Sequence, residues 1–285
     1  MSTLALGHAG SRRNGRRLPF DPWHLVLAPT AILFALPFAW MVLSSFMSNA
    51  QIDRFPPTIV PSSLHLAGWS AVLNAEFPTW FLNSTIVAVV TVLSNLVFCA
   101  LAGYAFARLR FRGSTTLFAL ILATLIIPFQ ITMIPTFIMM RALGLTNSLG
   151  ALIVPNLVTP FGVFLMRQFF VSLPVEVEDA ARIDGCSRLG VLRHVALPLA
   201  KPALATLSAI TFLVSWNELL WPLIAINGES SFTLPLGLTT FQGTHVTNWS
   251  AVMAGNVMTA APVVLAFLFT QRTFIASLTS TAVKG

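Results

Sequence analysis

Few side chains in this 285-residue sequence have the type and spacing that catalysis requires. The chain has no GxxxxGK[ST] phosphate loop, no HExxH pair and no CxxC pair. Its five histidines do not have metal-ligand spacing: His8, His24, His65, His194 and His245. The two cysteines, Cys99 and Cys186, are too few for a disulfide framework. We therefore expect no metal site, no cofactor bound by this chain and no ATPase site of its own, so the chain is not expected to be an enzyme.

One carboxylate, Glu218, lies inside an apolar stretch, next to Trp216 and Asn217. A charged side chain at mid-membrane costs about 2.5–3.5 kcal/mol, so it must face water, meet a partner or be protonated. One interpretation places Trp216, Asn217 and Glu218 on a translocation path. The other makes Glu218 a structural polar contact, or places it nearer the membrane interface. The sequence leaves both open.

Residues 173–202 form a charged segment unlike the rest of the chain: LPVEVEDAARIDGCSRLGVLRHVALPLAKP. Pro174 suits the first turn of a helix, and the acidic residues that follow suit its N-terminus. Gly185 should interrupt this helix, Ser187 can cap a second one, and Leu197-Pro198 should end it. The pattern predicts a helix–turn–helix elbow. It is either an amphipathic helix at the lipid surface or a docking element for another protein.

The elements that position these residues are membrane helices. Hydrophobic residues make up 56% of the chain and charged ones 9%, and its mean hydropathy is +0.82. A soluble domain carries about 25% charged residues. Six stretches reach the roughly 20 apolar residues that a span needs, namely 23–47, 80–106, 115–140, 142–166, 202–226 and 251–270. The predicted fold is therefore an all-α polytopic membrane protein with six transmembrane helices.

The basic residues predict the orientation of these spans, because cytoplasmic loops collect Lys and Arg. Of the 16, four precede the first span, three lie between the second and third, five between the fourth and fifth, and two follow the sixth. Only Arg54 and Arg141 fall on the other side. Both termini and the elbow are therefore expected in the cytoplasm, and the net charge of +7 gives no support to nucleic-acid binding.

The spacing within the elbow resembles the EAA motif of permease subunits of ATP-binding-cassette (ABC) importers. Asp179-Ala180-Ala181 is followed by three residues and Gly185, and nine further residues lead to a Val195-Ala196-Leu197-Pro198 end. Asp179 stands where the family has Glu, and Val195 where it has Ile. Trp216-Asn217-Glu218 and the C-terminal Ala282-Val283-Lys284-Gly285 resemble the carbohydrate-uptake branch of that family.

The resemblance implies a type I importer fold and a permease that moves a sugar or sugar-like solute: an oligosaccharide, a polyol or a glycerol phosphate. It implies an inner-membrane location and several partners: a second homologous permease, two cytosolic ATPase subunits that hold ATP and Mg, an extracytoplasmic solute-binding protein and membrane lipid. The elbow would couple the ATPase through Glu178, Asp179, Ala180, Ala181, Asp184, Gly185, Val195, Leu197 and Pro198.

The expected organisation has four parts. Residues 1–20 are a basic cytoplasmic tail, and residues 21–76 hold the first helix and an outer loop. Residues 77–274 are the transmembrane core, with the EAA loop at 174–202, and residues 275–285 are a cytoplasmic tail. The alternative function is an ion-coupled secondary transporter, which would need intramembrane ionisable residues beyond Glu218.

Overall fold

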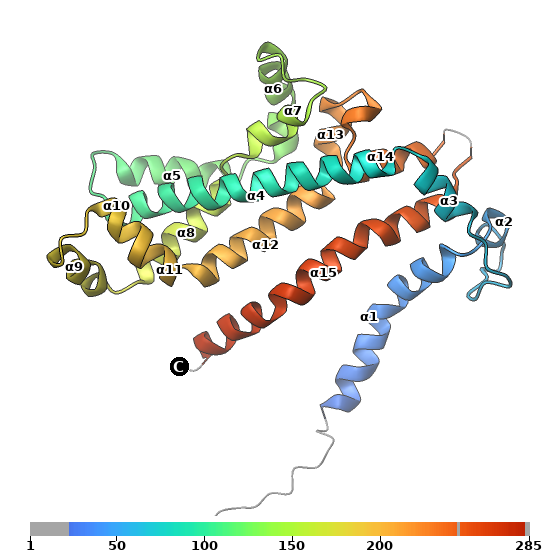
Figure 1. Cartoon of the computed structure of the whole chain (residues 1–285), viewed down its shortest axis with the longest axis horizontal. Helices are drawn as coiled ribbons and strands as arrows, with labels where there is room; N and C mark the ends of the chain where they lie inside the picture. The colour runs from blue at the N-terminus through green and yellow to red at the C-terminus, as the bar shows by residue number, and fades with distance from the viewer. Residues whose placement is uncertain (1–22, 244–245, 283–285) are drawn as a thin grey trace, which may run out of the picture.

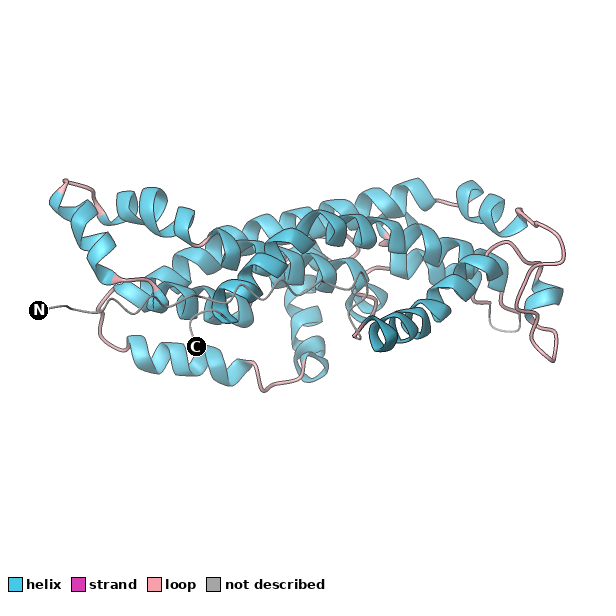
Figure 2. Ribbon diagram, turned by 90° about the horizontal axis from the view of Figure 1, so that it is seen from below, coloured by secondary structure: helices cyan, strands magenta, loops and turns pink. Residues whose placement is uncertain are grey.

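The computed structural model describes residues 23–243 and 246–282, which are mostly helical (Figure 1). The α-helices are α1 His24–Ser44, α2 Asn49–Ile52, α3 Ala67–Asn74, α4 Phe77–Arg108, α5 Ser114–Thr124, α6 Phe129–Ala142, α7 Leu149–Ile153, α8 Pro160–Ser172, α9 Val175–Ile183, α10 Arg188–Val191, α11 Leu197–Leu199, α12 Lys201–Asn217, α13 Leu220–Ala225, α14 Leu234–Leu238 and α15 Trp249–Ala282. The 3₁₀ turns are η1 Val154–Asn156, η3 Glu229–Ser231 and η4 Thr239–Phe241, and η2 Leu192–Ala196 is a π-helical turn. The described ranges contain no strand, only an isolated bridge between Gln242 and Thr247 (Figure 2). The all-α prediction is confirmed.

Helix length and composition identify the membrane-crossing segments. Among the described residues, α1, α4 and the 149–172 segment, which comprises α7, η1 and α8, are each long and apolar enough to cross as one span. Two bent pairs also qualify together: α5 with α6, and residues 188–199 with α12. α15 begins with a 17-residue apolar stretch, Trp249–Leu265. Three helices thus meet the criterion, or up to five if each bent pair is one span, against six predicted.

The third predicted span, 115–140, is wrong as a single helix. α5 and α6 meet at 103°, with residues 125–128 between them. Pro128 has no amide hydrogen to donate, and its ring disfavours helical geometry at Ile127. The amides of Leu125, Ile126 and Ile127 instead bond carbonyls three residues back, which closes α5.

The fourth predicted span also begins later than expected, because Ala142 belongs to α6 and the next helix starts at Leu149. Gly144 (φ +69°) and Asn147 (φ +59°) form the turn between them, and both residue types tolerate a positive φ. Asn147 also accepts hydrogen bonds from the amides of Asn227 and Gly228 through its side-chain oxygen. The turn is thereby tied to the chain that follows α13.

α4 is the central helix and lies against α8 and α12. A Cβ atom at Gly103 would lie 2.6 Å from the Met166 Cβ, and one at Gly162 would lie 2.6 Å from the Cys99 Sγ. Small residues at these points let the α4 and α8 backbones approach closely, as membrane helix pairs commonly do. The resulting core at the elbow end of the bundle joins α4, α8, η2 and α12 through buried residues that include Tyr104, Phe170 and Leu207.

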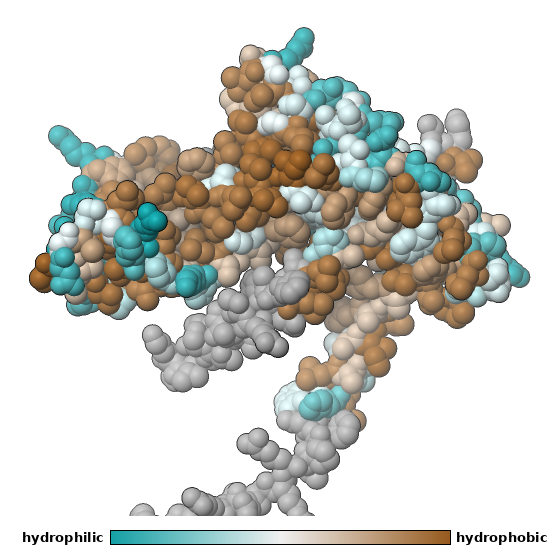
Figure 3. Space-filling model, viewed as in Figure 1, coloured by the Kyte–Doolittle hydropathy of each residue, from teal (hydrophilic) through white to brown (hydrophobic). Residues whose placement is uncertain are grey.

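The surface is divided into hydrophilic ends and a hydrophobic middle. Hydrophilic residues gather at the end formed by α9 and at the opposite end near α2 and α3, with a hydrophobic band between them (Figure 3). α1 carries exposed apolar side chains along its length, such as Leu25 and Phe34. Residues 1–20, the predicted basic tail, and residues 283–285 lie outside the described residues. α15 continues without a break past the predicted boundary at 274, so that boundary does not coincide with a helix end.

Candidate functional site: the elbow and the cavity

Helix α9, which forms the first arm of the elbow, follows the local sequence rules closely. Pro174 precedes its first residue, Glu176 and Glu178 lie in its first turn, and Arg182 lies in its last. These charges complement the helix dipole. Gly185 makes the turn with φ +89°, where glycine is favoured. Ser187 then caps α10, and its hydroxyl accepts a hydrogen bond from the Gly190 amide at 3.1 Å.

The prediction that Leu197-Pro198 ends the second arm is wrong. Pro198 lies inside α11, and the chain bends by 76° only around Ala200. A proline ring inside a helix clashes with the carbonyl four residues back, here that of His194. The preceding turn η2 widens to a π-helix, in which the Leu197 amide bonds the Leu192 carbonyl. The extra residue in this turn accommodates the proline ring, and the helix continues to Leu199.

Glu178 faces the protein interior. Its carboxylate accepts a hydrogen bond from Arg108 Nε at 2.7 Å and another from the Tyr104 hydroxyl at 3.1 Å. Arg108 also donates to the Leu173 carbonyl at 2.8 Å, just before the elbow. The side chains of Arg108 and Glu178 are only 13% and 8% exposed, so this ion pair is largely shielded from water. The contacts fix the first arm to the C-terminal end of α4.

The other predicted coupling residues of the first arm lie mostly on its surface. Asp179 forms a 3.4 Å ion pair with Arg182, and both side chains are about half exposed. Ala180, Asp184 and Gly185 are exposed, and Ala181 is half-buried. Ile183 is an apolar side chain with 87% of its surface exposed. The tip of the elbow therefore presents small and apolar groups that this chain does not cover.

Along the second arm, Val195 and Leu197 are half-buried and Pro198 is exposed. Leu189, on α10, is 67% exposed and adds to the apolar surface of the tip. Sequence reasoning missed Tyr104 and Arg108, which hold Glu178. The only signal for them is the positive-inside count, which assigned Arg108 to the same side of the membrane as the elbow.

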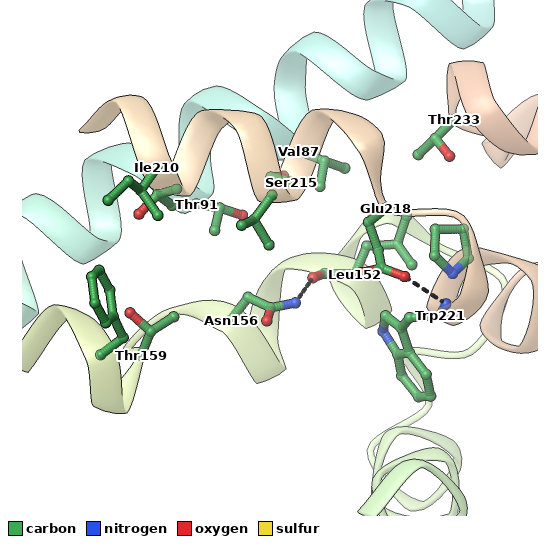
Figure 4. Close-up of a pocket in the computed structure, with 14 residues that line it drawn as sticks. Val87, Thr91, Leu152, Asn156, Thr159, Ile210, Ser215, Glu218, Trp221 and Thr233 are labelled. Carbon is green, nitrogen blue, oxygen red and sulfur yellow. Dashed lines mark hydrogen bonds between the residues drawn. The ribbon is translucent and has the colours of Figure 1, made fainter. Parts of the chain in front are cut away.

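A cavity of about 260 Å³ lies between α4, η1, α8, α12 and α13. Figure 4 shows polar side chains along it, contributed by Thr91, Asn156, Thr159, Ser215, Glu218 and Thr233. Thr211 also lines it. Val87, Leu152, Phe161 and Trp221 add apolar and aromatic surface. Hydroxyl and amide groups beside aromatic faces can hydrogen-bond and contact a small polar solute.

Glu218 lies where α12 ends, at an extended backbone position (φ −69°, ψ 122°). Its Oε1 accepts a hydrogen bond from the Trp221 amide at 3.2 Å, near the start of α13 (Figure 4). The Trp221 indole in turn donates to the Ala151 carbonyl at 2.9 Å. The predicted fifth span, 202–226, is therefore two helices, and Glu218 occupies the break between them, beside the cavity.

The other two residues predicted for the translocation path do not line this cavity. Trp216 is buried, and its indole donates to the Thr259 carbonyl of α15 at 3.1 Å. Asn217 is exposed, and its side chain bonds the Leu213 carbonyl one turn back. The structure thus separates Glu218 from its two neighbours. A role for any of the three in transport stays a prediction.

A buried hydrogen-bond cluster supports the cavity wall and had no sequence signal. The Asn95 amide nitrogen donates to the Asn156 carbonyl at 2.7 Å, and its oxygen accepts from the Thr159 hydroxyl at 2.7 Å. Asn95 is fully buried in α4. The first bond satisfies the Asn156 carbonyl, a backbone group that becomes free where η1 gives way to α8. Within the described ranges, no group of three His, Cys, Asp or Glu side chains lies close enough to hold a metal ion.

A helical membrane subunit with an internal polar cavity and a charged elbow at one end has the form of a transport component. The family described as "Binding-protein-dependent transport system inner membrane component" matches residues 97–278, so the chain belongs to this family. The resemblance inferred from Asp179, Gly185 and Pro198 is confirmed at the level of the family, as are the membrane-transport class and the inner-membrane location.

Two relatives illustrate the similarity. The arabinooligosaccharides transport system permease protein AraQ of Halalkalibacterium halodurans is 39% identical over 273 residues, which cover 94% of this chain and 98% of that protein. The lactose transport system permease protein LacG of Rhizobium radiobacter is 31% identical over 261 residues, or 91% of this chain and 95% of that protein.

Among solved structures, a chain of a bacterial ABC transporter involved in the import of the acidic polysaccharide alginate superposes with a TM-score of 0.77. It is 25% identical to this chain, and the alignment covers 89% of this chain and 98% of that one. The all-helical polytopic fold is therefore that of an ABC importer subunit.

Proposed function

We propose that this chain is a permease subunit of an ATP-driven importer for a sugar or sugar-like solute. Relatives that carry saccharide names support the substrate class, namely those named for arabinooligosaccharides, lactose, diacetylchitobiose and sulfoquinovosyl glycerol. The observation that carries the proposal is the pairing of a polar cavity with an elbow fixed to the same helix, α4. Thr91 of α4 lines the cavity, and Arg108 of α4 holds Glu178.

The chain would work with a second homologous permease, two cytosolic ATPase subunits and an extracytoplasmic solute-binding protein. ATP and Mg would be held by the ATPase subunits, and both termini of this chain would be cytoplasmic. The elbow tip, with Ala180, Gly185 and the exposed Ile183, would seat against an ATPase subunit. ATP binding can shift the permease between its inward-open and outward-open conformations only if the ATPase subunits contact the permease differently in each. The elbow would supply this contact.

The test is a matched pair of glycine substitutions. Gly185 and Gly144 both have a positive φ, and an added Cβ at either would meet no atom within 4 Å. Gly185→Asp and Gly144→Asp therefore impose similar backbone strain, but only Gly185 lies on the elbow. We expect Gly185→Asp to reduce ATP-dependent sugar uptake at least 10-fold and Gly144→Asp to leave it within about two-fold, at equal membrane abundance. Equal uptake by the two variants would refute the coupling role.

A second measurement separates this function from ion-coupled transport. Uptake into vesicles that contain the full complex should require ATP inside and should be blocked by vanadate. Uptake that continues with vanadate and follows an ion gradient would overturn the proposal.

A further inference from the structure

Two adjoining cavities lie along α5, from its first residue toward its last. The first, of about 660 Å³, is lined by Arg108, Arg110, Arg112, Ser114 and Phe111 among others. The second, of about 450 Å³, is lined chiefly by Leu117, Leu120, Ile121, Val158, Pro160 and Val163. Phe106 of α4 lines both, so the basic cavity and the apolar groove adjoin.

Two of the three arginines that line the basic cavity are not neutralised by an acidic side chain among the described residues. Arg108 is occupied by Glu178 and the Leu173 carbonyl. Arg110 and Arg112 are exposed and form no ion pair with any described residue. Gly113, at φ +81°, precedes α5 and has no side chain to cap the first amides of this helix. The positive end of the helix dipole therefore adds to the two guanidinium groups, and the cavity suits an anion.

The apolar groove suits a hydrocarbon chain. Leu117, Leu120, Ile121 and Thr124 repeat at helical spacing on one face of α5. Across the groove lie Val158, just before α8, and Pro160 and Val163 of its first turn. Leu120 keeps 59% of its surface exposed, so α5 and α8 leave this face open.

The depth of the groove matches one leaflet of the bilayer. α5 has 11 residues and is about 16 Å long, roughly half of the 30 Å hydrocarbon core. The 103° bend before α6 then falls near mid-membrane. The charged end of the groove therefore lies at a membrane surface and its apolar end in the hydrocarbon, in the order in which a phospholipid arranges its own groups.

We propose that these adjoining cavities bind one anionic phospholipid. Its phosphate group lies between Arg110, Arg112 and the first turn of α5, and one acyl chain lies between α5 and α8. The order of charge and hydrocarbon selects this occupant, because a soluble phosphate would fill only the basic cavity and a neutral apolar molecule only the groove. The bound lipid would complete the packing of α5 in the bundle.

The test measures lipid retained by the full chain, purified together with its partner subunits, by native mass spectrometry. Phosphatidylglycerol and phosphatidylcholine with identical acyl chains are the probes. We expect the wild type to retain phosphatidylglycerol preferentially. The double variant Arg110→Ala/Arg112→Ala should bind it about 30-fold more weakly, since each basic residue near an anionic lipid surface contributes roughly five-fold.

Arg54→Ala/Arg141→Ala is the matched control, because it removes the same charge from exposed positions outside the basic cavity. Equal phosphatidylglycerol retention by the two double variants overturns the proposal. So does loss of an ATPase subunit from Arg110→Ala/Arg112→Ala with lipid retention unchanged, which would assign the basic cavity to a protein partner.

The groove has its own test. Leu120→Trp should fill it and reduce phosphatidylglycerol retention several-fold, whereas Leu93→Trp, at a similarly exposed position on α4, should not. Glycerol phosphate added as a free headgroup should fail to displace the lipid. Displacement by glycerol phosphate would show that the headgroup alone carries the binding, and equal retention in both tryptophan variants would show that no acyl chain lies in the groove; either result overturns the proposal.

Discussion

Arg108 joins three segments at the C-terminal end of α4. Its Nε meets Glu178 of the elbow, its terminal nitrogen meets the Leu173 carbonyl, and Tyr104 one turn earlier shares the same carboxylate. Tyr104 in turn contacts the Phe170 ring of α8 edge-on, with ring centroids 5.4 Å apart. Because the Arg108–Glu178 pair is shielded from water, removal of one partner leaves the other charge buried and unpaired.

Arg108→Ala should therefore destabilise the chain by about 3–5 kcal/mol and loosen the elbow. Thermal unfolding of the purified complex measures the first effect, and uptake per ATP hydrolysed measures the second. Arg141→Ala removes an exposed arginine without an ion pair among the described residues and should change stability by less than about 0.5 kcal/mol. If Arg108→Ala unfolds at the wild-type temperature, the pair does not hold the elbow.

The helices of this fold are interrupted where a side chain can accept a hydrogen bond from a free backbone amide, or where a proline has no amide hydrogen to donate. α12 ends at Glu218, whose carboxylate bonds the Trp221 amide. α5 ends before Pro128, and η2 widens before Pro198. The cavity lies between the break at Glu218 and a further break between η1 and α8, where the backbone is not regularly helical. Irregular backbone at membrane depth is tolerated where it lines such a cavity.

Two substitutions at Glu218 separate its charge from its capping role. Glu218→Gln keeps an oxygen for the Trp221 amide, so stability should be unchanged, but it removes the carboxylate from the cavity. We expect a several-fold lower rate of sugar uptake. Glu218→Leu should also lose about 1 kcal/mol of stability, because the amide loses its acceptor. Wild-type uptake and stability in Glu218→Gln would leave Glu218 with no transport role.

At the scale of helices and turns, some features could be predicted from the sequence and others could not. Apolar length located most of the membrane segments, and Gly185 and Ser187 located the turn and cap of the elbow. The bend at Pro128 and the π-helical turn before Pro198 were missed, because a proline in a membrane helix is compatible with a kink, a widened turn or a full break. The inward direction of Glu178 was missed because it depends on Arg108, 70 residues earlier in the chain.

At the scale of the whole molecule, labelling of the two native cysteines can test whether the ATPase subunits cover the elbow. Cys186 is exposed at the elbow tip, and Cys99 is fully buried between α4 and α8. A water-soluble maleimide should label Cys186 of the free chain rapidly, and bound ATPase subunits should slow this labelling at least 10-fold. Cys99 should react only after denaturation. Rapid labelling of Cys186 in the full complex would place the ATPase subunits away from the elbow.

α4 sets the geometry of any movement that the elbow passes on. Its 32 residues extend about 48 Å, more than the 30 Å of hydrocarbon they cross. Arg108 attaches the elbow at one end, and Trp80 packs against Gly237 of α14 near the other. If α4 turns as a rigid rod about its Arg108 end, a tilt of 10° displaces its Trp80 end by roughly 8 Å. A small rotation at the elbow would thus be large enough to open a solute-sized passage at the opposite end of the helix.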